Sequence, residues 1–164
     1  MISRRLALTE NWLALYEEVA ACREACGDRA KLKVILAIGN LGRLEIVAKS
    51  AMVAMLAGAD TIKTSTGFEA TNATLEGALV MVRQIRRFQE ENGGIKVGFK
   101  PAGGIRTAAD AWKLLILMQE ELGSEWTQPD LFRIGASSLL LDLQRQLHHQ
   151  VTGRYAGGYR IAAA

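Results

Sequence analysis

The sequence predicts an α/β fold made of parallel βα repeats. Short apolar runs, rich in Ile, Val and Leu, alternate along the chain with longer segments of helical spacing. After a first helix the strand–helix unit occurs four times, and glycine or small polar residues follow each strand. This order is typical of a parallel sheet covered by the helices that connect its strands.

The predicted strands are short and mostly apolar. The first, KLKVILAI, is an almost continuous apolar run, as expected for a buried strand of a parallel sheet. Gly39 ends this run. We expect strands over residues 31–38, 61–65, 95–100 and 131–135.

Helices are expected before and between these strands. Asn72 is a candidate N-cap, and Ala57-Gly58 and Asn92-Gly93-Gly94 are typical helix ends. The helical segments cover residues 11–25, 44–56, 72–90, 108–122 and 138–151. The length suits a single domain, which we expect over residues 1–155, with a flexible C-terminal tail over residues 156–164.

The composition excludes several classes of protein. The chain has 164 residues, 49% of them hydrophobic, and 20 Lys and Arg against 17 Asp and Glu. This apolar content is too high for a disordered chain, and no apolar run approaches the ~20 residues of a membrane helix. Basic residues are scattered among acidic ones, so we expect neither a nucleic-acid nor a membrane partner.

The cysteines and the N-terminal residues bear on the compartment. Cys22 and Cys26 lie four apart on a predicted helix, a spacing that seldom allows a disulfide. The two Cys and two His residues lack the spacing typical of metal ligands, so the sequence predicts no metal site. The opening MISRRLALTENW has no signal-peptide pattern. We expect a cytoplasmic protein without a metal.

Two lysines near predicted strand ends carry the first chemical signal. Lys63 lies inside TIKTST and Lys100 ends VGFK. Burial and a neighbouring ammonium both lower the pKa of a lysine, and a neutral lysine forms Schiff bases with carbonyl compounds. Neighbouring strands lie about 4.8 Å apart, so the two side chains can approach each other. The alternative is that each ammonium reaches solvent and has no role. Lys33, near the start of its strand, is a weaker candidate.

Two loops are candidates for holding an anion. Gly103 and Gly104 precede a predicted helix, and Arg106 adds a guanidinium. The segment GASS, residues 135–138, offers similar amide groups together with hydroxyls before the last helix. Together these loops favour a phosphate site at the carboxyl ends of the strands. Either loop alone is also compatible with a simple turn before a helix.

Three segments resemble one enzyme family. Residues 57–67 (AGADTIKTSTG), 97–107 (VGFKPAGGIRT) and 132–140 (FRIGASSLL) closely resemble deoxyribose-phosphate aldolase. The resemblance implies a class I aldolase that interconverts 2-deoxy-D-ribose 5-phosphate with D-glyceraldehyde 3-phosphate and acetaldehyde, without a cofactor. It also implies a (β/α)₈ TIM barrel, of which this chain resembles the C-terminal part and lacks the first three βα units.

The resemblance also assigns roles to residues. Lys63 is implied as the Schiff-base lysine, and Lys100 as the neighbour that lowers its pKa and helps to move protons. Thr64 and Thr66 are implied as lining the same pocket. The residues implied to hold the phosphate are Gly67, Gly103, Gly104, Arg106, Gly135, Ser137 and Ser138.

This chain departs from the family pattern at several positions. The catalytic Asp of the family is expected just before Met1, and Phe68 stands where the family often has a phosphate-contacting Lys. Ala37 and Ile38 stand where Glu and Thr are usual. Tyr159 is a weaker candidate for the family's C-terminal Tyr. These departures predict reduced activity.

The truncation and the departures leave several functional hypotheses. A chain with so few βα units cannot close a barrel by itself, so its sheet would have exposed edges. Exposed edges predict a homo-oligomer, most simply a two-fold dimer. The chain is either an aldolase or a catalytically impaired fragment that binds sugar phosphates. A third hypothesis, another phosphate-binding barrel enzyme such as an isomerase, does not require Lys63 and Lys100 in these motifs.

Overall fold

The computed structural model describes residues 1–157. Its sheet has three parallel strands in the order β1 (Lys33–Ile35), β2 (Thr61–Lys63) and β3 (Gly98–Lys100). The expected α/β fold with parallel strands is therefore confirmed. Long helices flank these strands. Helix α2 (Trp12–Cys26) precedes β1, α4 (Leu44–Leu56) and α5 (Leu75–Glu91) connect the strands, and α6 (Ala108–Leu122) follows β3.

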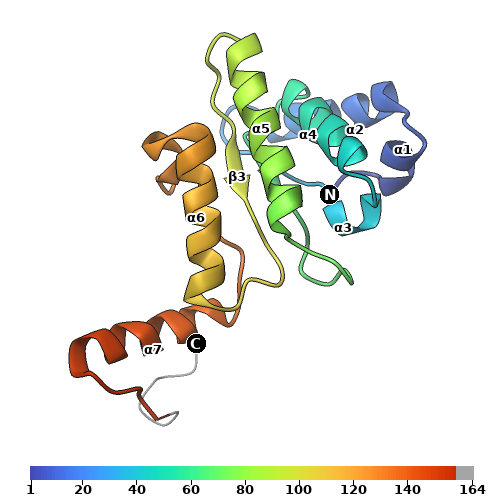
Figure 1. Ribbon diagram of the computed structural model, residues 1–164. Helices are drawn as coiled ribbons and strands as arrows, with labels where there is room; N and C mark the ends of the chain where they lie inside the picture. The colour runs from blue at the N-terminus through green and yellow to red at the C-terminus, as the bar shows by residue number, and fades with distance from the viewer. Residues whose placement is uncertain (158–164) are drawn as a thin grey trace.

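Three short elements lie at the ends of these units: α1 (Arg4–Leu8), α3 (Ile38–Leu41) and the 3₁₀ turn η1 (Ser124–Thr127). A further long helix, α7 (Leu139–Thr152), follows them. Figure 1 shows α1 and α2 at one end of the molecule and α7 at the other, with α4, α5 and α6 between them. In residues 1–157 no helix is long and apolar enough to cross a membrane.

One face of the sheet packs on the helices and forms the core. Val34, Ile62 and Phe99 are register partners on the three strands, and each is at most 5% exposed. Met81 and Ile85 of α5 are fully buried in the same cluster. Because side chains alternate along a strand, the neighbours of these residues project from the opposite face. That opposite face carries Lys33, Lys63 and Lys100.

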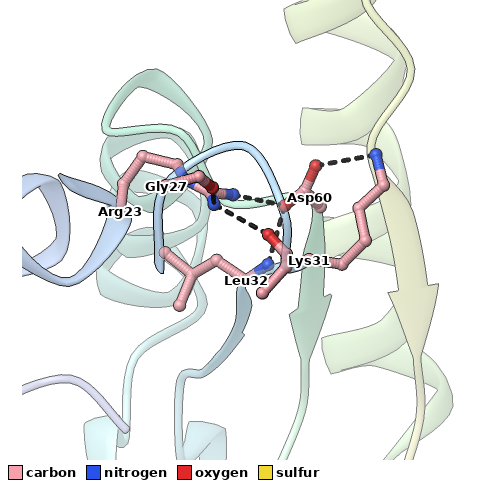
Figure 2. A network of polar contacts seen from close by, with 6 residues as sticks. Arg23, Gly27, Lys31, Leu32 and Asp60 are labelled. Atoms are coloured by element: carbon pink, nitrogen blue, oxygen red, sulfur yellow. Dashed lines mark hydrogen bonds and ion pairs between the residues drawn. The ribbon is translucent and has the colours of Figure 1, made fainter. Parts of the chain in front are cut away.

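A polar network holds the amino ends of β1 and β2 (Figure 2). Asp60 Oδ2 accepts hydrogen bonds from Arg23 Nη1 at 2.6 Å and from the Leu32 amide at 2.7 Å. Lys31 Nζ donates to Asp60 Oδ1 at 3.1 Å, and Arg23 also donates to the Gly27 carbonyl. The network joins the end of α2 to the sheet, at the end away from the carboxyl ends of the strands.

The fourth expected strand is not a regular strand. Residues 131–135 run parallel to β3, but only two isolated bridges form, Phe99 to Phe132 and Ala102 to Gly135. The amide groups of Leu131 and Phe132 both donate to the Gln128 carbonyl, at 3.0 and 2.8 Å. Pairing with β3 is nevertheless present around Phe132, since the Phe99 amide donates to the Leu131 carbonyl at 2.7 Å and the Arg133 amide donates to the Phe99 carbonyl at 3.3 Å.

Two other expectations need correction. Asn72 is not the N-cap of α5, because the Thr74 hydroxyl accepts from the Gly77 amide at 3.1 Å and the helix begins at Leu75. The first strand ends at Ile35 rather than residue 38, since Ala37 adopts a left-handed φ of 56° and α3 follows. A left-handed residue cannot continue a strand.

Candidate active site

The two candidate lysines lie side by side at the carboxyl ends of β2 and β3. Lys63 and Lys100 are register partners, and both are half-buried. Ile35 is the partner of Lys63 on β1, and Lys33 lies two residues earlier on the same face. Register partners on parallel strands project to the same side. The sheet therefore brings Lys63 and Lys100 together, with the more exposed Lys33 farther toward the amino end.

The electrostatic surroundings favour a neutral Lys63. Desolvation by burial lowers the pKa of Lys63, and the positive charge of Lys100 lowers this pKa further. The carboxylate of Glu69 acts in the opposite direction. The pKa of Lys33 is also lowered, by desolvation and then by the charges of Lys100, Arg133 and Lys63. A lowered pKa increases the fraction of neutral amine, and the neutral amine is the form of lysine that attacks a carbonyl carbon.

A cleft of about 390 Å³ opens at this end of the sheet. Its walls come from the loops that follow β2, β3 and the bridged segment at residues 132–135. Most of the residues expected from the sequence line it: Lys63, Thr66, Gly67, Gly103, Gly104, Arg106, Gly135, Ser137 and Ser138. Lys100 lies next to it, since a Cβ added to Gly135 would come 3.1 Å from Lys100 Cε.

The Gly-rich loop after β3 requires its glycines. Gly103 has a φ of 86°, and an added Cβ would lie 2.6 Å from the Asn72 side chain. Gly104 also has a positive φ, 82°. The loop leads into α6, whose first turn is fixed by a capping box between Thr107 and Asp110. The amide end of α6 is therefore held near the cleft.

The loop before α7 contributes hydroxyl groups. Ser137 and Ser138 are exposed, and Ser138 occupies the N-cap position of α7 without a capping hydrogen bond from its side chain. Within residues 1–157 the amide groups of Gly104, Ser137 and Ser138 donate no hydrogen bond. These donors are available to an anion in the cleft.

Comparison with known proteins shows the family to which the chain belongs. The model of the DeoC/LacD family aldolases matches residues 1–145. The chain belongs to the DeoC/LacD aldolase family. It is 60% identical over 156 residues to the deoxyribose-phosphate aldolase of Mus musculus and 58% identical to that of Homo sapiens. Each comparison covers 95% of this chain and 48% of the relative, so the chain spans about half the length of these relatives.

Solved structures share the fold. A Toxoplasma gondii ME49 protein assigned as a deoxyribose-phosphate aldolase superposes with a TM-score of 0.75 at 26% identity, covering 90% of this chain and 57% of that one. The aldolase QR15 superposes with a TM-score of 0.66 at 25% identity, covering 92% of this chain and 58% of its own.

The segment after β2 contains one exposed and one buried residue that the sequence analysis singled out. Phe68 is 98% exposed at the rim of the cleft. Thr64, expected in the pocket, is fully buried and lies outside the cleft lining. Its hydroxyl accepts from the Ala102 amide at 2.9 Å and donates to the Ala102 carbonyl at 3.1 Å. Thr64 therefore joins β2 to the loop that follows β3.

Sequence reasoning missed Glu69, whose charge acts on Lys63. Both carboxylate oxygens of Glu69 lie 3.1 Å from the Thr66 amide, and one accepts from the Gly67 amide at 3.1 Å. The spacing of Glu69 could have indicated this role, because it lies three residues after Thr66 in a turn that contains Gly67. Polar side chains at such a spacing often form hydrogen bonds with the backbone of the turn. Tyr159 and most of the expected tail lie outside the described residues.

Proposed function

We propose that this chain acts as a class I aldolase on 2-deoxy-D-ribose 5-phosphate, releasing D-glyceraldehyde 3-phosphate and acetaldehyde, and that it catalyses the reverse addition. The observation that carries this proposal is the pairing of Lys63 with Lys100 at a cleft that also contains two amide-rich loops. A neutral amine beside an ammonium suits Schiff-base chemistry. The amide-rich loops suit a phosphate.

In the proposed reaction Lys63 is the nucleophile. Its neutral Nζ adds to the aldehyde carbon of the sugar, and loss of water leaves an iminium. A base removes the proton of the C3 hydroxyl, and the C2–C3 bond breaks. Its electron pair moves toward the iminium, which releases glyceraldehyde 3-phosphate and leaves an enamine of two carbons on Lys63. Protonation of the enamine and addition of water then free acetaldehyde and regenerate Lys63. Lys100, its register partner, is the proposed group for lowering the pKa of Lys63 and moving protons.

The proposed phosphate site lies in the cleft, at the loops that precede α6 and α7. Arg106 supplies positive charge, and the amide of Gly104 and the hydroxyls of Ser137 and Ser138 supply donors, whereas the Gly103 amide already donates to the Gly135 carbonyl at 3.3 Å. The resemblance also assigned the amide of Gly67 to phosphate binding. That amide already donates to Glu69 at 3.1 Å and to Asn72 Oδ1 at 3.1 Å.

The alternative function is that of a catalytically impaired fragment that binds sugar phosphates. The observation that favours it is coverage, because the chain spans about half the length of its aldolase relatives. Such a fragment would bind phosphate in the cleft and form no productive imine. The two functions therefore make opposite predictions for turnover.

We also propose a homo-oligomer in a reducing, cytoplasmic setting. Trp112 of α6 and Leu147 of α7 are 62% and 66% exposed, and Val151 is 84% exposed. Large apolar side chains on neighbouring helices are typical of surfaces that bind another chain. The free thiols of Cys22 and Cys26 suit a reducing compartment. Light scattering that gives the mass of one chain would contradict the oligomer.

Turnover tests the proposed function. We expect cleavage of 2-deoxy-D-ribose 5-phosphate, measured as acetaldehyde formation, and its loss in Lys63→Leu. Lys113→Leu, an exposed lysine of α6, is the matched control and should retain the wild-type rate. If Lys63→Leu retains full activity, the assignment is wrong. If the folded wild type has no activity but binds inorganic phosphate, the impaired-fragment alternative is supported.

A further inference from the structure

The two walls of the cleft differ in their free hydrogen-bond donors. On the wall formed by residues 66–69, the Thr66 hydroxyl donates to Glu69 at 2.8 Å, and the amides of Thr66 and Gly67 also donate to this carboxylate. The second wall is formed by the loops at residues 103–106 and 135–138, and there the amides of Gly104 and Ser138 have no acceptor within residues 1–157. The Arg106 amide is bonded to Asp110 at 3.3 Å, so the free donors of the second wall are those of Gly104 and Ser138.

The carboxylate of Glu69 is well held. Desolvation raises its pKa, but hydrogen bonds from the amide and hydroxyl of Thr66 and the amide of Gly67 together bring this pKa below its ordinary value. Glu69 is therefore ionised at neutral pH. Its loop is further fixed by Asn72, whose Nδ2 donates to the Glu69 carbonyl at 2.6 Å.

The charge of Glu69 also acts on Lys63. The cationic groups on the same side of the sheet or in the cleft are Lys33, Lys100, Arg106 and Arg133. Lys100 disfavours the ammonium form of Lys63, whereas Glu69 favours it. Glu69 therefore affects both the nucleophile and any anion that enters the cleft.

We propose that Glu69 is a positioning and specificity-determining residue, which occupies the amides of Thr66 and Gly67 and so leaves a substrate phosphate to bind the second wall at Gly104, Arg106 and Ser138. The proposal rests on the proposed aldolase function for the identity of the substrate. A phosphate placed on the first wall would displace Glu69 or lie against its negative charge. On the second wall the same phosphate meets the free amides of Gly104 and Ser138 and the Arg106 guanidinium.

The test measures binding of inorganic phosphate by calorimetry in wild type, Glu69→Gln and Glu69→Ala. Gln retains an acceptor for the two amides but removes the charge, so we expect phosphate to bind about three to ten times more tightly. Ala also frees the amides, so we expect an affinity at least as high as that of the Gln variant. Glu17→Gln, an exposed glutamate of α2, is the matched control and should match the wild type.

A second readout separates this role from a purely structural one. The pH at which half of Lys63 is trapped by acetaldehyde and borohydride should move down in Glu69→Gln, because the ammonium loses a stabilising charge. Phosphate affinity that is unchanged or weaker in the folded variants, or a midpoint that stays at the wild-type pH, overturns the proposal. If wild type forms no adduct on Lys63, the aldolase proposal fails, and the phosphate affinities still decide the role of Glu69.

Discussion

Lys63 and Lys100 project from the same face of the sheet as register partners on adjacent strands, both half-buried at the cleft. The pairing follows from two strands that each place a lysine at the third position, in TIK and GFK. Desolvation and the neighbouring charge of Lys100 together lower the pKa of Lys63. This relationship raises the neutral fraction of Lys63 and makes it the candidate nucleophile.

Lys100→Met should raise the pKa of Lys63, because the variant removes the positive charge that disfavours the ammonium form. The neutral fraction of Lys63 would then appear at higher pH. We expect the pH midpoint of imine trapping to move up, with a slower rate at pH 7. Mass spectrometry of borohydride-reduced samples across a pH series measures this. Lys113→Met should keep the wild-type midpoint, and a downward shift in Lys100→Met would contradict the charge argument.

Arg106→Ala should weaken phosphate binding by about tenfold, as expected for one charge-assisted contact at an exposed site. The loss should appear in the KM for phosphorylated substrate and in the calorimetric affinity for inorganic phosphate. Imine formation with acetaldehyde, which carries no phosphate, should keep its wild-type rate. Arg5→Ala, an exposed arginine of α1, is the control. Equal phosphate affinity in the two variants would remove Arg106 from the site.

Thr64→Val should destabilise the fold by about 1–3 kcal/mol, because it leaves the buried amide and carbonyl of Ala102 without their hydroxyl partner. Val has nearly the same shape, so the change isolates the hydrogen bonds from packing. Urea unfolding followed by circular dichroism measures the difference. Thr9→Val, whose hydroxyl donates to the carbonyls of Arg5 and Leu6 at an exposed helix end, should cost less. A neutral Thr64→Val variant would show that the bridge contributes nothing.

Asp60→Asn should lower stability at neutral pH by about 1–2 kcal/mol, because Asp60 receives charged and amide donors at 25% side-chain exposure. Desolvation raises the pKa of Asp60, but the Leu32 amide, Lys31 and Arg23 together bring it below its ordinary value of 3.8. A lowered carboxyl pKa contributes stability that is complete above the unfolded-state pKa and is lost as the pH falls through the folded-state pKa.

The pH dependence of unfolding checks this assignment for Asp60. The wild type should lose the Asp60 contribution below about pH 4, whereas Asp60→Asn should be flatter over that range. Asp28→Asn, an exposed residue in the loop after α2, should follow the wild-type curve. If Asp60→Asn and wild type lose stability in parallel, other carboxyl groups account for the acid sensitivity.

Local sequence signals predicted the helices better than the strands. The expected bounds of α4 and α6 match the structure, because α4 ends at Leu56, just before Ala57-Gly58, and the Thr107–Asp110 box fixes the start of α6. The bounds of the last helix differ by one residue at each end, since it runs from Leu139 to Thr152. Apolar runs overestimated the strands, because the same residues also fill the turn into α3 and the bridged segment after η1.

The residues of the cleft could be predicted where a reactive or anion-binding side chain lies close after a predicted strand. The ends of parallel strands meet at one edge, so Lys63, Arg106 and Ser138 were expected together, and the structure places them in one cleft. The role of Thr64 was not predictable, because its hydroxyl bonds to a backbone 38 residues away. Glu69 was missed because a charged residue in a glycine turn normally reads as a solvated surface group.

The most direct test of the central claim is borohydride trapping with acetaldehyde, resolved by peptide mass. Lys63 has a lowered pKa and lies in the cleft. We therefore expect a reduced adduct on Lys63 in preference to other lysines such as Lys113. Lys63→Leu should abolish that adduct without transferring it to Lys100. A folded protein that forms no adduct on Lys63, or forms it equally on exposed lysines, would contradict the account.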